Sequence, residues 1–302
     1  MTAECPVCAG HNADESFTKD GFRHFHCRDC NSLYLFPTPS KSALFEYYVA
    51  REEATRSSQC WEREENAYRH YEPIWDQALR QIEKDSGRGP LLDVGCGGGQ
   101  FLAFARQRGW EQLEGIEYAP GAATRARERT GAEVHTVDFL ASGLEPAQYA
   151  GITMWNVIEH AADPRAFVAE VYRLLRPAGT YVADCPNRYG ITMRAIGKEA
   201  YVVMPPEHLT YFGHRSLRRL LENAGLEVRK LASNTIYIND WVRFLTKPAK
   251  EQEAREAHLS WYSRMTGTSV GMLLIGLANV ALNAAHLGDQ MLVFAQRPED
   301  QS

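Results

Sequence analysis

The sequence predicts an α/β protein with a doubly wound, Rossmann-like sheet, preceded by a small cysteine-rich module. Three observations support this fold class. An apolar run ends in a glycine-rich turn at 91–99, strands and helices alternate from residue 91 onward, and two Cys-x-x-Cys pairs fall within residues 1–36. The 302 residues, 44% of them hydrophobic, suffice for one sizeable α/β domain with additions.

The amino-terminal module, residues 1–36, carries four cysteines whose pairs are separated by 18 residues: Cys5, Cys8, Cys27 and Cys30. Aromatic stretches at 16–17 and 22–26 predict ribbon strands between the pairs. Tight Cys-x-x-Cys turns direct two thiolates each at one tetrahedral ion, so we expect a structural zinc (Zn2+) site with no open coordination position. A redox dithiol is the alternative, and His24 and His26 could compete as ligands.

No secretory signal opens the chain, since its first eight residues are short of apolar side chains. Paired cysteines without such a signal indicate a reducing compartment. We therefore expect a cytoplasmic protein.

Residues 37–89 predict a helical linker or cap. Prolines open this segment, and helical spacing of apolar residues predicts helices over 43–48 and 61–82. Aromatic stripes of this kind usually pack against a core. A helix here could also cover a ligand pocket, which keeps Tyr48 and Tyr71 as candidates.

The central strand and its turn come next. A short apolar run at 91–94 predicts a buried parallel strand, Gly95, Gly97 and Gly99 follow it, and a helical pattern begins at Phe101. Such a turn lets the backbone approach a nucleotide-like ligand. The spacing does not meet the G-x-G-x-x-G dinucleotide fingerprint, and a plain tight turn is the alternative.

Two further strands end at acidic residues. The strand at 113–116 runs into Glu117, 22 residues after the first glycine, where an acid can accept hydrogen bonds from ribose hydroxyls. The strand at 134–137 runs into Asp138 and Phe139, a pair that suits the amine and ring of adenine. The alternatives are a surface glutamate, and a loop acid beside a core phenylalanine.

The fourth strand, 152–157, leads into Ile158-Glu159-His160, and the fifth, 180–183, ends before Asn187. Ligands of such sheets bind at the carboxyl ends of the strands. We therefore expect these positions to face one crevice: 95, 117, 138, 156–160 and 187.

After the fifth strand, residues 187–215 predict a lid. The sixth strand, 227–232, and the last, 290–296, are separated by 57 residues, which predicts a helical insert over 234–289. Its apolar part is predicted as a packing helix, because two asparagines and a histidine share one face. A membrane span and an interfacial or lipid-substrate role are the alternatives.

Together these motifs resemble the class I S-adenosylmethionine (SAM) methyltransferases. The chain most resembles the branch with an amino-terminal zinc ribbon, which is associated with natural-product, sugar and cell-envelope biosynthesis. The resemblance covers nearly the whole chain and implies a seven-stranded methyltransferase domain over 90–302. The matching segments are Asp93–Gly99, Glu117, Asp138, Trp155–His160, Leu175–Gly179, Pro186–Asn187 and Glu207–Phe212. The insert departs from the minimal fold, and Ala178 stands where glycine is usual.

The resemblance implies SAM as cofactor. The glycine turn would approach its methionine and ribose, Glu117 the ribose hydroxyls, and Asp138 with Phe139 the adenine. The implied SAM-binding residues are Asp93, Gly95, Gly97, Gly99, Glu117, Tyr118, Asp138, Phe139, Asn156 and Val157.

The fourth-strand segment also resembles that of ubiquinone-type O-methyltransferases, some of which place a Glu-x-x-Glu-His metal site there. Asn156 replaces the first acid, so a catalytic divalent metal is not expected. Glu159 and His160 could still contact the substrate.

Methyl transfer to a hydroxyl or carbon acid needs a base. His208 is the first candidate, because imidazole titrates near neutral pH and the residue lies beside Glu207 and Tyr211. A histidine that holds the lid by hydrogen bonding is the alternative. His160 is the second candidate, and Tyr211 could orient the base or the acceptor.

The expected acceptor is a small-molecule, sugar or lipid-linked intermediate, methylated on oxygen or carbon. The net charge of −5 shows no electrostatic footprint for nucleic acid. An RNA methyltransferase that uses its ribbon for RNA contact, or a non-catalytic SAM-fold partner protein, are the alternatives. Peripheral membrane contact stays open, and the sequence specifies no oligomeric state.

Overall fold

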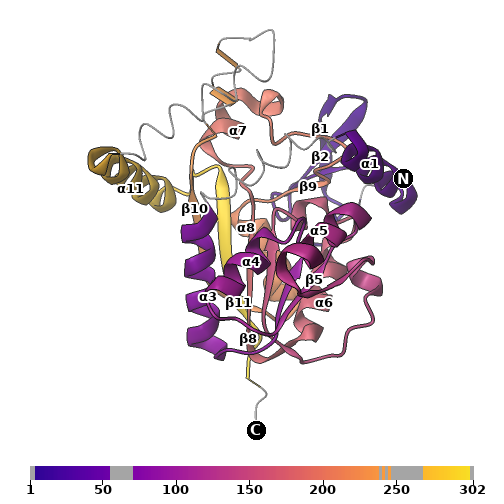
Figure 1. Cartoon of the computed structure of the whole chain (residues 1–302). Helices are drawn as coiled ribbons and strands as arrows, with labels where there is room; N and C mark the ends of the chain where they lie inside the picture. The colour runs from indigo at the N-terminus through magenta and orange to yellow at the C-terminus, as the bar shows by residue number, and fades with distance from the viewer. Residues whose placement is uncertain (1–3, 55–70, 238–239, 242–243, 246–267, 300–302) are drawn as a thin grey trace. The chain divides into compact units, whose positions relative to one another are not determined.

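The computed structural model describes residues 4–54, 71–237, 240–241, 244–245 and 268–299. The chain divides into two compact units. Unit 1 comprises residues 1–37, 185–217 and 231–292, and unit 2 comprises the remaining three stretches, 38–184, 218–230 and 293–302. Figure 1 colours these stretches by residue number.

A seven-stranded sheet has the order β10-β11-β8-β7-β4-β5-β6, which confirms the predicted fold class. The pairings of β4 with β5 and β7, of β5 with β6, and of β7 with β8 are parallel. The strands are β4 (Leu91–Val94), β5 (Leu113–Ile116), β6 (Glu133–His135), β7 (Tyr149–Trp155), β8 (Leu175–Pro186), β10 (Glu227–Asn234) and β11 (Gln290–Gln296).

Strand β8 begins earlier than its predicted first residue, Thr180. Tyr149 of β7 pairs with Leu175 and Gly151 pairs with Thr180, so the intervening residues form an irregularity within the strand. Ala178 adopts a φ of 61° there. The prediction missed this segment because a proline and a glycine normally mark the end of an element.

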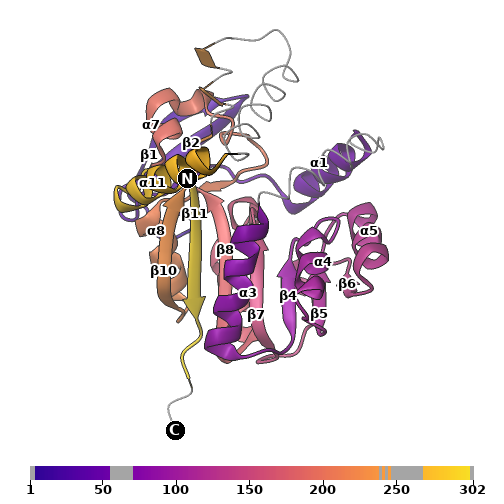
Figure 2. The same ribbon diagram turned by 60° about the vertical axis from the view of Figure 1, so that its left-hand side comes forward.

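Four helices of unit 2 flank these strands: α3 (Glu72–Ser86), α4 (Gln100–Gln107), α5 (Pro120–Thr130) and α6 (Pro164–Leu174). Helix α3 buries Trp75, Ala78, Leu79 and Ile82, as its apolar spacing predicts. Figure 2 shows this helix alongside β7. The amino-terminal part of that predicted helix, 61–70, lies outside the described residues. Helix α1 (Lys41–Ala54) is longer than the predicted 43–48.

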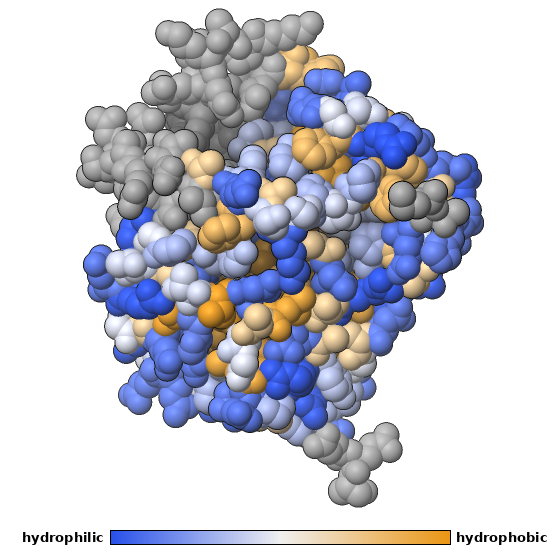
Figure 3. Space-filling model, turned by 90° about the vertical axis from the view of Figure 1, so that its right-hand side faces the viewer, coloured by the Kyte–Doolittle hydropathy of each residue, from blue (hydrophilic) through white to orange (hydrophobic). Residues whose placement is uncertain are grey.

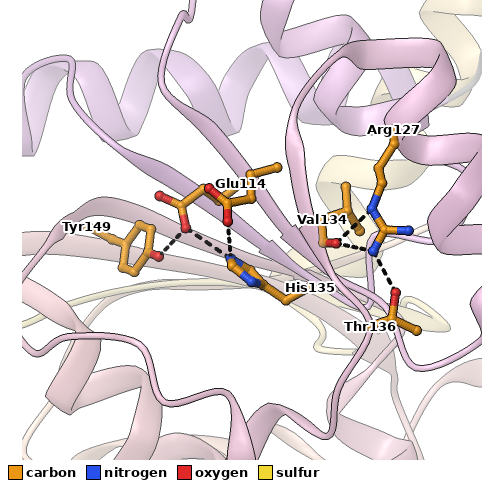
Figure 4. A network of polar contacts seen from close by, with 7 residues as sticks. Glu114, Arg127, Val134, His135, Thr136 and Tyr149 are labelled. Atoms are coloured by element: carbon orange, nitrogen blue, oxygen red, sulfur yellow. Dashed lines mark hydrogen bonds and ion pairs between the residues drawn. The ribbon is translucent and has the colours of Figure 1, made fainter.

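The short strand β6 is tied to its neighbours by side chains (Figure 4). Tyr149 donates a hydrogen bond of 2.7 Å to a Glu114 carboxylate oxygen, and His135 Nε2 lies 3.4 Å from the same oxygen. The Arg127 guanidinium donates to the Val134 carbonyl and, at 2.6 Å, to the Thr136 hydroxyl. These contacts link β5, β6 and β7 beyond the few backbone bonds that a three-residue strand can form.

In unit 1, the amino-terminal module forms an antiparallel sheet of order β1-β2-β3-β9. Its strands are β1 (Ala13–Lys19), β2 (Phe22–Cys27), β3 (Leu33–Leu35) and β9 (Thr210–Tyr211). The two predicted ribbon strands are thus present. The fourth strand comes from the segment predicted as a lid, so the module shares one compact unit with residues 185–217 instead of ending as a separate body at residue 36.

Within unit 1, polar side chains tie the insert to neighbouring segments. Asp289 accepts hydrogen bonds from the Thr192 amide and hydroxyl and from the Tyr237 amide. Asn279 and Asn283 of α11 (Ser269–Ala284) accept bonds from backbone amides at the end of β10. Leu277 and Val280 of α11 are nevertheless 58% and 69% exposed, so a packing role for this helix stays a prediction. Among the described residues no helix is long and apolar enough to cross a membrane.

The remaining elements are α7 (Ile191–Ile196), α8 (His214–Asn223) and the short 3-10 helices η2 (Phe139–Ala141), η3 (Ile158–His160) and η4 (Gly197–Glu199).

The face drawn in Figure 3 is largely hydrophilic, with apolar side chains interspersed among the polar ones.

Candidate functional site

The turn after β4 depends on three glycines for different reasons. All have positive φ: 71° at Gly95, 53° at Gly97 and 78° at Gly99. A Cβ at Gly95 would lie 2.5 Å from Val157 Cγ2, and a Cβ at Gly99 would lie 3.0 Å from the Ala126 backbone. A Cβ at Gly97 would meet only the Gln100 side chain, at 4.0 Å. Packing therefore requires the outer two glycines, whereas Gly97 borders open space where a ligand can approach.

The end of β5 carries a carboxylate next to this open space. Glu117 Oε2 accepts a hydrogen bond of 2.8 Å from the Gly97 amide, and Oε1 accepts one of 2.8 Å from the Ala119 amide. The predicted proximity of the glycine turn and Glu117 is thus present in the structure. Tyr118 follows, 38% exposed, with its ring edge-on to Phe45 of α1 at 5.0 Å between centroids.

Of the two residues predicted to bind adenine after β6, Phe139 lies in different surroundings from those predicted. The Asp138 carboxylate accepts bonds of 3.0 Å from the Leu140 amide and from Lys41 Nζ of α1. Phe139 is only 3% exposed and packs edge-on against Phe167, with ring centroids 5.3 Å apart. Its surroundings match the core phenylalanine that the sequence left as the alternative, so of this pair only Asp138 stays a predicted adenine contact.

After β7 the chain turns sharply. Asn156 has a φ of 53°, its amide donates to Asp184 Oδ1 at 2.8 Å, and its side-chain amide donates to the Tyr71 hydroxyl at 3.0 Å. Val157 packs beneath Gly95, and His160 Nδ1 lies 3.0 Å from the Tyr48 hydroxyl. Both tyrosines kept as candidates therefore contact this segment.

Helix α1 contacts the loops that follow three strands, through Lys41, Phe45 and Tyr48. Lys41 and Phe45 were missed by the sequence reasoning. On a short, mostly exposed helix no local pattern distinguishes them from ordinary surface residues.

Asp93 and Glu159 are two of the buried carboxyl groups of this region. Asp93 is 1% exposed, accepts a bond of 2.7 Å from the Thr153 hydroxyl, and has its pKa raised to about 8, mainly by burial. Glu159 is 2% exposed, and neither of its oxygens has a hydrogen-bond partner among the described residues. Burial raises the pKa of Glu159 well above its ordinary value.

Asn187, the last position expected in the crevice, belongs to unit 1. Its side-chain amide donates to the carbonyls of His286 and Gly288, so it ties the end of the insert.

The catalytic candidates His208 and Tyr211 also belong to unit 1. The His208 side chain is buried, its Nδ1 donates a bond of 2.7 Å to the Val202 carbonyl, and its amide donates one of 3.0 Å to the Met204 carbonyl. Tyr211 lies with its ring centroid 6.1 Å from that of His208 and its hydroxyl 3.4 Å from His24 Nε2. Burial raises the pKa of Tyr211 above the normal range of a phenol.

The four cysteines of the module come together: their sulfur atoms all lie within 4.8 Å of one another. The Sγ–Sγ distances are 3.6 Å from Cys5 to Cys30 and 3.6 Å from Cys8 to Cys27. Sulfurs at about 2.3 Å from a tetrahedral zinc ion lie about 3.8 Å apart, so the donor set and spacing fit such an ion. Neither His24 nor His26 belongs to this group of ligand atoms, which consists of the four cysteines.

A family model described as a methyltransferase domain matches residues 64–231, more than half of the chain. The chain belongs to the class I SAM-dependent methyltransferases. Two curated relatives of this methyltransferase are ubiquinone biosynthesis O-methyltransferases. The protein from Dinoroseobacter shibae is 31% identical and aligns over 50% of this chain and 69% of its own. The protein from Leptothrix cholodnii is 29% identical over 56% of this chain and 78% of its own.

Solved structures support the fold. Phosphoethanolamine N-methyltransferase 2 of Haemonchus contortus, in complex with SAM, superimposes with a TM-score of 0.51 at 19% identity, over 74% of this chain and 53% of that one. A SAM-dependent methyltransferase from Archaeoglobus fulgidus gives 0.50 at 18% identity, over 83% and 99%. At these identities the likeness concerns the fold alone.

Gly97→Ala should weaken binding of S-adenosylhomocysteine to the methyltransferase by about tenfold or more, because a methyl group would enter the open space beside Glu117. Isothermal titration calorimetry measures this. Gly131→Ala is the matched control, since Gly131 also has a positive φ, 62°, and its Cβ would meet nothing within 4 Å. Both changes should cost about 1–2 kcal/mol in stability. Equal affinity in the two variants would contradict the proposed position of the ligand.

Asp93→Asn should remove a pH dependence of stability. Between pH 5 and 8 folded Asp93 keeps a proton that the unfolded chain has lost, so raising the pH destabilises the wild type. The stability advantage of the variant should grow by about 1.4 kcal/mol per pH unit over this range, measured by urea unfolding. Asp163→Asn, at the exposed start of α6, should show no such trend, and a flat difference for Asp93→Asn would refute the prediction.

Proposed function

We propose that this methyltransferase methylates a hydroxyl oxygen or an acidic carbon of a small-molecule, sugar or lipid-linked biosynthetic intermediate, with His208 as the base. The observation that carries the proposal is the bond from His208 Nδ1 to the Val202 carbonyl. Because a carbonyl only accepts, this bond places the proton on Nδ1 and makes Nε2 the basic nitrogen of the ring. The O-methyltransferase names of the relatives agree with an oxygen acceptor.

SAM, when bound, supplies a methyl group on a sulfonium sulfur that is already an activated leaving group. Residues of unit 2 fit this cofactor: Glu117 for the ribose hydroxyls, the Gly97 backbone for close approach, and Asp138 for the adenine amine. Tyr118 and the Asn156–Val157 turn would complete its surroundings. Asp93 and Phe139 would support the cofactor site from within the protein, since both side chains are buried.

The acceptor must also be oriented and deprotonated. His208 Nε2 would take the proton that the acceptor atom gives up. SAM would supply the methyl group to that atom and leave as a neutral thioether. Tyr211 serves as an orienting residue, because its raised pKa disfavours a phenolate base. His160 is placed by Tyr48 and shapes the segment after β7.

We further propose that the four cysteines bind one structural zinc ion. Ser32 supports this, because its hydroxyl lies 3.3 Å from Cys5 Sγ and 3.2 Å from Cys30 Sγ, where it can donate to thiolates. Four protein ligands leave no position for substrate.

His208→Gln should lower the rate of methyl transfer about 100-fold or more, because a general base contributes that much, while affinity for S-adenosylhomocysteine stays the same. The assay follows radiolabelled methyl from SAM into small-molecule, lipid, RNA and protein fractions of a host extract. His135→Gln is the control, since glutamine can still donate to Glu114. Label in RNA would overturn the acceptor class, and full activity of His208→Gln would remove His208 from the role.

Cys27→Ser should reduce the zinc content from about one ion per chain to a small fraction of that, because three thiolates bind zinc less tightly than four. A colorimetric zinc assay after thiol modification measures the content. Cys185→Ser, at a buried cysteine outside the cluster, should retain the metal. A zinc-free wild type would contradict the assignment.

A further inference from the structure

We propose that Lys19 and His24 of the amino-terminal ribbon are positioning residues for His208. This inference rests on the proposed function, in which His208 is the base. According to this inference, the ribbon holds in place the backbone segment that orients the imidazole ring of His208. All the residues involved lie within unit 1.

The orientation of His208 depends on three consecutive residues, 202–204. The Val202 carbonyl accepts from the His208 ring, and the Met204 carbonyl accepts from the His208 amide. Residues 202–204 are turn and irregular backbone, without a helix or strand ladder of their own. Their geometry must therefore be held by contacts with other segments.

The ribbon supplies these contacts through two side chains. Lys19, at the end of β1, donates a hydrogen bond of 2.6 Å to the Val203 carbonyl. His24, in β2, acts through Tyr211: its Nε2 lies 3.4 Å from the Tyr211 hydroxyl, which in turn is bonded by the Met204 backbone. Lys19 thus holds the middle residue of the turn, and His24 holds the third.

The proton positions in the two rings allow the Tyr211 hydroxyl to donate to His24. His24 Nδ1 bonds to the Phe22 carbonyl and so carries the proton, which leaves Nε2 to accept from the Tyr211 hydroxyl. Burial lowers the pKa of His24 to about 4, so the ring is neutral near pH 7. The ring also stacks on Phe17, with centroids 4.4 Å apart, which fixes its plane.

Backbone pairing and apolar packing make the connection rigid. Strand β9 pairs with β3 through Leu33 and Tyr211, and the Leu35 amide donates to the Leu209 carbonyl at 2.9 Å. One buried cluster contains ribbon and turn residues together: Leu33, Ile196, Ala200, Val202, Val203 and Tyr211. A displacement of the ribbon sheet would therefore move both ends of the segment that carries His208.

The test compares Lys19→Met and His24→Phe with the wild type. Methionine keeps the aliphatic length of lysine without its donor, and phenylalanine keeps the stacking on Phe17 without the acceptor nitrogen. His24→Gln restores an acceptor and should recover function in part. Arg23→Met, the neighbouring position on β2, is the control, because the Arg23 side chain is half-exposed and its ion pair is with Glu15.

Two measurements report on His208 without the methyl acceptor. Hydrogen exchange followed by mass spectrometry gives the protection of residues 202–212. A nuclear magnetic resonance titration follows the ring signals of His208 as the pH changes. These signals are assigned by their absence in His208→Gln. We expect about tenfold faster exchange and a shifted His208 titration in both test variants. Zinc content and affinity for S-adenosylhomocysteine should match the wild type.

In the extract assay, kcat should fall in both test variants while KM for SAM is unchanged. Unaltered exchange and titration in both would overturn the inference, and so would loss of zinc from both, since the ribbon itself would then be unfolded. If the wild type labels no small molecule, the proposed function fails, whereas exchange and titration still decide whether Lys19 and His24 position His208.

Discussion

The hydrogen bond from the Gly97 amide to the Glu117 carboxylate joins the two loops on which the proposed cofactor site depends. Parallel pairing of β4 with β5 sets these loops side by side, with Val94 opposite Ile116 at the ends of the strands. The amides of Gly95 and Cys96 both donate to the Ile116 carbonyl, which turns the chain back over β5. Only glycine adopts this succession of positive φ values at little cost, so the backbone turns tightly and leaves open space beside Gly97.

A different constraint governs the residues proposed to act on the acceptor. His208 and Tyr211 lie in a segment with little secondary structure, and the ribbon compensates for this by taking Thr210–Tyr211 as its fourth strand. The cysteine cluster is thus connected to the proposed chemistry through a sheet and a buried apolar cluster, without contributing a ligand position for substrate. This accounts for a four-cysteine module in a methyltransferase whose proposed base lies in a segment with little secondary structure.

Much of the fold could be predicted because its signals are local. Apolar runs predicted β4, β5 and β7, and the spacing of the cysteines predicted their cluster. The proximity of the glycine turn to Glu117 followed from the rule that parallel strands end at one edge of the sheet. Glycine spacing could not show which glycine borders open space, since that depends on Val157 and Ala126, both distant in sequence.

The missed features depend on long-range contacts. Phe139 is a core residue because Phe167 of a later helix packs on it, and the Asp138 partner Lys41 is 97 residues away. Pairing of β9 with β3 joins segments that precede and follow most of the α/β region in the sequence, and a two-residue strand has no periodicity to detect. The sequence indicates only that Asp93 is an acidic residue near the end of a strand. The structure shows that its side chain is buried and accepts a hydrogen bond from Thr153.

The most direct test of the cofactor site is a calorimetric titration of S-adenosylhomocysteine into the wild type and into Glu117→Gln. The wild type should bind one molecule per chain. The variant should bind about tenfold more weakly or worse, because it loses a charged acceptor for the ribose hydroxyls. Glu114→Gln, in the neighbouring polar network, should bind as the wild type does. No binding by the wild type, or equal affinity in Glu117→Gln, would contradict the proposed cofactor site.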